Sequence, residues 1–142
     1  MKEQNFKNHS RLSLGWHGFT AFSIIALIIG STINVFKSCE GNIYSAALLL
    51  LISVVLLFTW FFARVFALKA QDRVIRLEEN LRAQSLSGKP LSKGLHIRQI
   101  IGLRFASDEE FLALADRAEK EKLTEKEIKM AIVNWRADYY RV

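Results

Sequence analysis

Two uninterrupted apolar runs dominate the first half of the chain, and a mostly polar remainder follows them. The first run, residues 18–36, has no charged side chain and would be about 28 Å long as a helix, close to the thickness of a bilayer core. The second run, residues 43–68, carries only Arg64, near its end, where a long side chain can reach the headgroups. Neither run has a polar stripe, and the chain is too short to cover them. The pattern therefore predicts two transmembrane helices.

Only residues 37–42 separate the two runs, so the pattern predicts a helical hairpin with a short external turn. Three basic residues lie in the N-terminal segment 1–17, Lys37 alone lies between the runs, and several more follow the second. The positive-inside rule then predicts that both ends of the chain are cytoplasmic. The first run lacks the small-residue cleavage pattern of a signal peptide, so we expect a retained anchor.

The helical pattern continues beyond the second run. No glycine or proline occurs from 43 to 87, which predicts that the second helix extends as a cytoplasmic stalk over 69–84. Apolar residues recur along this helix with a heptad spacing. They are Trp60, Ala63, Ala67, Ala70, Val74, Leu77 and Leu81.

This heptad pattern has two interpretations. Its cytoplasmic part, Ala67, Ala70, Val74, Leu77 and Leu81, is a candidate self-association seam. In that case Arg73 and Glu78 occupy positions that pair across a parallel dimer. Alternatively, the same stripe packs on the C-terminal helices of its own chain, because an apolar stripe specifies burial but not the partner.

After a turn-rich linker, residues 85–94, the sequence predicts a small helical cytoplasmic module over 95–142. Ser107 with Glu110, and Thr124 with Glu127, have the spacing of capping boxes, so helices should begin near Asp108 and Glu125. We expect the first of these helices to bury Phe111, Leu114, Ala115 and Ala118, and the second to bury Ile128, Ala131, Ile132 and Trp135.

The net charge of +6 is concentrated next to the predicted membrane. Arg64, Lys69, Arg73 and Arg76 are candidates for contact with anionic lipid headgroups. Nucleic-acid binding is less favoured, because no binding fold is recognisable and aromatic residues do not interleave with the charges.

The chain offers little that resembles reactive chemistry. His9, His17, His96 and the single Cys39 are too scattered to suggest a metal site. The acidic run 108–110 has a structural explanation, since it complements the dipole at the start of a helix. Without a phosphate-binding loop or a nucleophile motif, the sequence predicts no catalytic, metal or cofactor site, and a protein that is not an enzyme.

Several segments resemble a bacterial family of two-span membrane proteins that is catalogued as a domain of unknown function. These segments are Asn5-Phe6-Lys7-Asn8-His9 with His17, Ala70-Gln71-Asp72-Arg73, Leu103-Arg104-Phe105-Ala106-Ser107-Asp108-Glu109-Glu110-Phe111, Glu127-Ile128-Lys129 and Trp135-Arg136-Ala137-Asp138. The resemblance covers almost the whole chain and implies a location in the bacterial cytoplasmic membrane. It implies no activity and no catalytic residues.

Together these features predict an all-α membrane protein that consists of a transmembrane hairpin, a stalk and a helical module. We expect the module to serve interactions, either in a homo-oligomer or as an accessory subunit of a larger membrane complex. One alternative is an oligomeric channel or transport component, with Ser23, Ser31 and Asn34 lining a pore. Another is a membrane-tethered binder of nucleic acid or anionic lipid.

Overall fold

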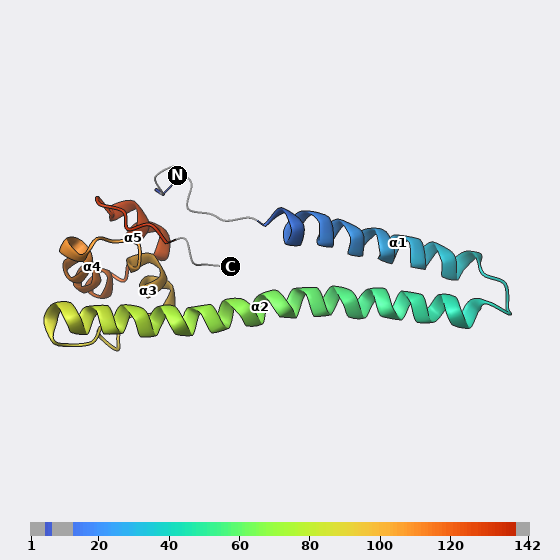
Figure 1. The fold of residues 1–142 in the computed structure, drawn as a ribbon, viewed down its shortest axis with the longest axis horizontal. Coiled ribbons are helices and arrows are strands. Elements are labelled where there is room, and N and C mark those ends of the chain that lie inside the picture. The colour runs from blue at the N-terminus through green and yellow to red at the C-terminus, as the bar shows by residue number, and fades with distance from the viewer. Residues whose placement is uncertain (1–4, 7–12, 139–142) are drawn as a thin grey trace. The chain divides into compact units, whose positions relative to one another are not determined.

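The computed structural model describes residues 5–6 and 13–138, and in this part of the chain all regular secondary structure is helical. The elements are η1 (Leu14–Thr20), a π-helical segment, and then α1 (Ala21–Lys37), α2 (Ile43–Ser87), α3 (Ile97–Leu103), α4 (Asp108–Lys120) and α5 (Glu125–Ala131) (Figure 1). Within the described residues the only β-type pairing is an isolated bridge between Ala106 and Trp135. The chain divides into two compact units between Phe66 and Ala67.

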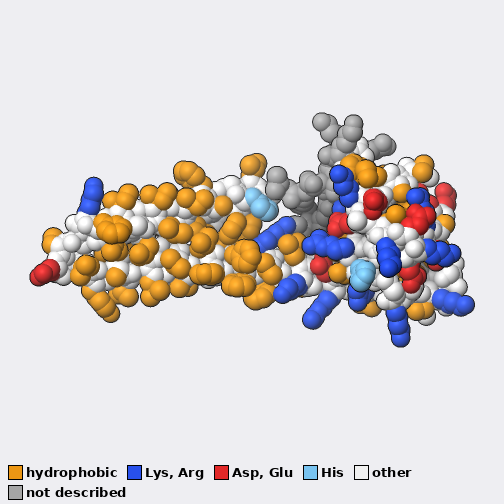
Figure 2. All heavy atoms as spheres, turned by 180° about the vertical axis from the view of Figure 1, so that it is seen from behind, with side chains coloured by type: hydrophobic (Ala, Val, Ile, Leu, Met, Phe, Trp, Pro, Cys, Tyr) orange, Lys and Arg blue, Asp and Glu red, His pale blue; other side chains and the backbone are white. Residues whose placement is uncertain are grey.

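The first unit is a hairpin of η1 and α1 against the first part of α2. Helices Leu14–Lys37 and Ile43–Ser87 are both long and apolar enough to cross a membrane. The first of them begins as a π-helix rather than as the regular α-helix that the sequence suggests. Large apolar side chains cover the outer surface of this unit, as Figure 2 shows.

A few contacts of small and aromatic side chains join the two helices of the hairpin. Ala46 and Ser53 of α2 are almost fully buried, and the Ser53 hydroxyl lies 3.1 Å from that of Ser31 in α1. The Trp16 and Trp60 rings stack with centroids 6.0 Å apart, and the Trp60 indole N–H donates to the Trp16 carbonyl. The helices therefore pack closely while leaving most of their apolar surface outward.

The second unit, which we call the module, packs α3, α4 and α5 against the last part of α2. Phe105, Phe111, Leu103 and Ile128 are fully buried in its core. The face of α4 that the sequence assigned to the core is buried as expected, since Phe111, Leu114, Ala115 and Ala118 are all inaccessible. Ile75 and Ala83 of α2 belong to the same apolar cluster.

The close approach of α3 and α5 depends on a residue without a side chain. A Cβ atom on Gly102 would lie 3.1 Å from the Ile128 side chain and 3.2 Å from the backbone oxygen of Glu125. Such distances are tighter than ordinary van der Waals contact, so the absence of a Cβ at position 102 favours this close approach of α5 to α3.

Two element boundaries differ from the sequence-based expectation. Helix α2 ends at Ser87 rather than at residue 84, and Gly88 follows with a positive φ of 74°. Helix α5 ends at Ala131, so Ile132 and Trp135 are not on its face. They lie in the extended segment that follows, where Trp135 bridges to Ala106 and its ring packs on Phe105 at 5.0 Å. The apolar spacing of that segment resembled a helix, but tertiary pairing with the α3–α4 connection determined its conformation.

Candidate functional site

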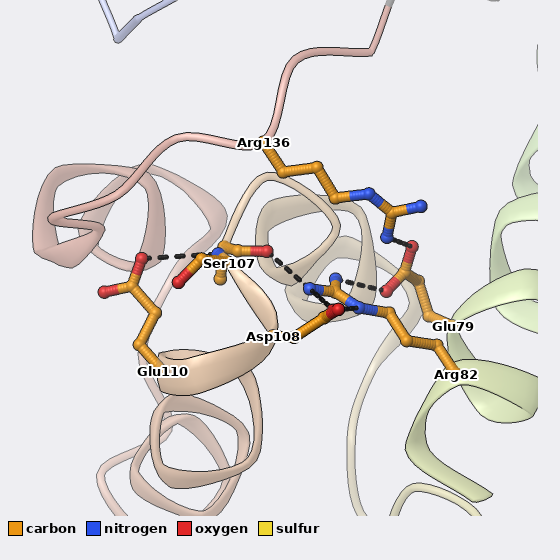
Figure 3. Close-up of polar contacts among 7 residues, drawn as sticks. Glu79, Arg82, Ser107, Asp108, Glu110 and Arg136 are labelled. Carbon is orange, nitrogen blue, oxygen red and sulfur yellow. Dashed lines mark hydrogen bonds and ion pairs between the residues drawn. The ribbon is translucent and has the colours of Figure 1, made fainter. Parts of the chain in front are cut away.

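Arg82 of α2 is a polar side chain that contacts several parts of the module. Its guanidinium donates to Glu79 at 3.0 Å, to Asp108 at 2.6 Å and to the carbonyl of Ala106 at 2.7 Å. The guanidinium plane also lies over the Phe111 ring, 4.3 Å from its centroid. Figure 3 shows the contacts of Arg82 with Glu79 and Asp108, which join α2 to the start of α4. A planar group with five donors suits this role, which a lysine could not fill in the same way.

Glu79 is the acidic partner on the same face of α2. Only 6 % of its side chain is accessible, and its second oxygen lies 3.8 Å from Arg136, in the segment after α5. Burial raises the pKa of Glu79, and the hydrogen bond and charge of Arg82 oppose that rise. A buried carboxylate needs such partners to remain ionised, so this cluster holds α2, α4 and the segment after α5 together.

A pocket of about 560 Å³ adjoins this cluster. Arg82, Arg104 and Arg136 line it, and so do three acids, Glu78, Glu79 and Asp138. Arg104 is itself nearly buried and lies 3.2 Å from Asp138, and burial lowers its pKa. Because the acidic and basic groups balance in number, the pocket has no excess of positive charge that would favour an anion.

The four predicted capping residues lie at the starts of α4 and α5. The Thr124 hydroxyl accepts from the Glu127 N–H at 3.3 Å, and Glu127 accepts from the Thr124 N–H at 2.7 Å. The bond from the Thr124 N–H, together with one that the Thr124 hydroxyl donates to the same carboxylate at 2.8 Å, lowers the pKa of Glu127. At α4, Glu110 accepts from the Ser107 N–H at 3.4 Å, but the Ser107 hydroxyl has no hydrogen-bond partner among the described residues.

Glu110 has a second role that the capping pattern did not suggest. Its carboxylate also accepts hydrogen bonds from the backbone N–H groups of Val133 and Asn134, each at 3.1 Å. The same side chain therefore ties the start of α4 to the extended segment after α5.

The candidate seam is not the face of α2 that contacts the module. Val74, Leu77 and Leu81 are 52, 61 and 56 % exposed, whereas Ile75, Glu79 and Ala83 are buried. These three side chains are therefore not buried against the chain's own α3–α5, although Val74 and Leu81 line the pocket beside Glu79 and Arg82. Ala70 is exposed as well, and Ala67 is partly buried.

The candidate lipid contacts differ in their surroundings. Lys69, Arg73 and Arg76 are exposed, whereas Arg64 is partly buried and already has an interaction partner. Cys39 is exposed in the turn between α1 and α2. Among the residues that the structure describes, no group of three His, Cys, Asp or Glu side chains could hold a metal ion.

Sequence reasoning missed several residues that organise the module. The buried Gln99 amide donates to the carbonyls of Ala118 and Leu123, which fastens α3 to the end of α4. The spacing of Glu79 and Arg82, three residues apart on a helix, was a signal that could have been used. Their contacts with Asp108 and Arg136 join segments distant in sequence, which no local pattern reveals.

Comparison with known proteins places the chain in one family. Residues 1–142 match a family model described as "Family of unknown function (DUF6526)", and the chain belongs to this family. No curated protein and no solved structure matches the chain.

Proposed function

For this member of a family without an assigned function, we propose a non-enzymatic role as a two-span protein of the bacterial cytoplasmic membrane. In this proposal the hairpin anchors the chain, both ends are cytoplasmic, and the module serves as an interaction platform. The platform acts in a homo-oligomer or as an accessory subunit of a larger membrane complex.

The observation that carries this proposal is the opposite distribution of apolar side chains in the two units. The hairpin turns residues such as Phe22 and Phe58 outward, an arrangement that is favourable in lipid and costly in water. The module buries Phe105 and Phe111 and exposes charged side chains, as a water-soluble domain does. Figure 2 shows the charged side chains gathered over the module.

The basic residues after the apolar run support the proposed orientation. Lys69, Arg73 and Arg76 are exposed on α2 directly after the segment expected to cross the bilayer. Each is worth about 1 kcal/mol near an anionic cytoplasmic leaflet. The principal buried charges, Arg82 and Glu79, are engaged in holding the module together, which supports a structural rather than a catalytic role for them.

Topology can be tested with the single native cysteine. A membrane-impermeant maleimide should label Cys39 in spheroplasts, because the turn is expected to face outward. In a C39S background, S92C in the module should be labelled only after the membrane is opened. Labelling of S92C from outside would overturn the proposed orientation.

The interaction role can be tested by mild crosslinking and affinity purification from native membranes. A partner that depends on the module should bind less to F111A, which destabilises the module core, and as well as before to F58A, which changes an exposed hairpin residue. A protein that stays monomeric and copurifies with nothing would contradict the proposal.

A groove on the hairpin supports a second candidate, an oligomeric channel or transport component. The groove has a volume of about 540 Å³, and Ser23, Ser31 and Asn34 of α1 line it together with Ser53 and apolar residues of α2. Within it the Ser31 hydroxyl lies within hydrogen-bond distance of the Ser53 hydroxyl. Absence of ion flux in liposomes that contain the purified protein would remove this candidate.

A further inference from the structure

The part of α2 that belongs to the module has two different faces. Ile75, Glu79 and Ala83 are buried against α3–α5. Val74 precedes Ile75, so it lies about 100° from that buried residue around the helix. Leu77 and Leu81 are each two residues from Glu79, about 160° away. Val74 and Leu81 also line the pocket beside Glu79 and Arg82. The stripe therefore faces largely away from the packed residues, and its three side chains remain more than half exposed.

This stripe is unusual for a surface in water. Three aliphatic side chains follow one another at spacings of three and four, each more than half exposed. Lipid is an unsuitable cover for Leu81, the distal residue of the stripe, under the proposed topology. Leu81 is thirteen residues beyond Leu68, about 20 Å along a continuous helix, whereas interfacial side chains reach only about 5–10 Å into the headgroup boundary.

We propose that Val74, Leu77 and Leu81 form the centre of a parallel two-stranded coiled coil between two copies of this chain. A β-branched residue at position a, here Val74, with leucine at position d, here Leu77, favours two parallel strands. Ala67 and Ala70 continue the seam toward the membrane, where their small side chains let the two helices approach each other closely.

The charged residues beside the seam also favour a second copy of this chain in parallel orientation. Arg73 at position g and Glu78 at the next position e are the pair that meets across a parallel coiled coil. Both side chains are exposed, and neither forms an ion pair within the described part of the chain. An antiparallel arrangement would instead bring like charges together across the seam.

This inference rests on the proposed function, because the proposed topology supplies the geometry. Two copies inserted in the same orientation present their α2 helices in parallel and with the same register. Confinement to one membrane also raises their effective concentration, so a short seam can associate where a soluble peptide of this length would not.

The test is disulfide crosslinking of the full-length chain in inverted membrane vesicles, with C39S as the background. Mild oxidation should convert most of the V74C protein and most of the L81C protein into covalent dimers. In each dimer the disulfide joins the same position of two chains. R76C is the matched control, because Arg76 is exposed on the same helix but lies off the seam. We expect at least tenfold less dimer from R76C.

Three further variants separate a specific interface from random collision. L77D should lower the crosslinking of V74C at least tenfold, while thermal unfolding of the module stays unchanged because Leu77 is not in its core. R73E should also weaken crosslinking, and R73E combined with E78R should restore it.

The inference fails if V74C and R76C crosslink equally, or if neither forms a dimer. It also fails if V74C forms disulfides chiefly with another protein. Cys39 labelling gives an independent result on the topology. If the topology holds while crosslinking fails, the dimer alone is wrong and the proposed membrane platform stands.

Discussion

The hairpin and the module use apolar side chains in opposite ways. In the hairpin the described residues that are nearly inaccessible are Ile24, Ala46 and Ser53, while most phenylalanines and leucines point outward. In the module Phe105, Phe111 and Leu103 are fully buried. The difference shows that helix formation does not decide where apolar groups go. The hairpin leaves its apolar surface outward, which suits the proposed membrane location, whereas the module makes its own apolar interior. Equivalent substitutions should therefore have unequal effects in the two units.

The largest difference is expected for phenylalanine truncation. F111A should lower the free energy of unfolding of the module by about 3–5 kcal/mol, because it removes a fully buried ring and the contact under Arg82. F58A, at an exposed hairpin position, should leave the module unchanged. Urea-dependent pulse proteolysis in mild detergent measures both. Equal losses would mean that the two units do not differ as described.

The next largest loss of stability is expected for substitution of Arg82. R82A leaves Glu79 buried without its main partner and should destabilise the module by about 3 kcal/mol at pH 8. This is the low end of the range for a broken buried ion pair, because Arg136 remains near Glu79. R82K should cost less, since it keeps a positive charge.

The stability of R82A should depend on pH through the protonation of Glu79. Burial raises the pKa of Glu79 above its unfolded value of 4.5, and loss of Arg82 raises it further. Stability from this group is therefore fully present below that unfolded value and is lost as the pH rises through the folded pKa. Denaturation curves should show R82A recovering as the pH falls from 8 to 5. Adding E79Q should abolish this recovery, and a persistent pH dependence would point to another group.

Alanine substitution of one glycine in each unit should give a smaller difference in stability. G102A forces a methyl group against Ile128 and a backbone oxygen, and should destabilise the module by about 2 kcal/mol. G30A in the hairpin meets nothing within 4 Å and should cause no loss, because alanine is the better helix former. Hydrogen exchange of α3 and of α1 would measure the two effects. Tolerance of G102A would show that α3 and α5 are farther apart than described.

The smallest effect is expected inside the hairpin. S53A removes the contact with Ser31 and should cost about 0.6 kcal/mol, a typical value for a hydrogen bond between transmembrane helices. T59A is the control, since the Thr59 hydroxyl donates only to Val55 of its own helix among the described residues. Unfolding in increasing mole fractions of sodium dodecyl sulfate compares them. A larger loss with T59A would contradict the assignment.

Local patterns predicted the helices more reliably than they predicted packing partners. The absence of glycine and proline from 43 to 87 predicted the unbroken α2, and the Thr124–Glu127 spacing predicted the start of α5. The apolar spacing after Ile128 failed to predict the end of α5, because Trp135 pairs with Ala106 instead of continuing the helix. The acidic run at the start of α4 was explained as capping, but Asp108 also binds Arg82.

The sequence by itself determined that this protein has two long apolar helices and a small polar helical remainder, because periodicity, chain-breaking residues and charge act locally. It also marked an apolar stripe on α2. Only the tertiary structure decided that the module packs on a different face, through Ile75, Glu79 and Ala83, and leaves Val74, Leu77 and Leu81 exposed. The physical reason is that an apolar face specifies only that it avoids water, while the choice of partner depends on contacts such as that of Arg82 with Asp108, between residues far apart in sequence.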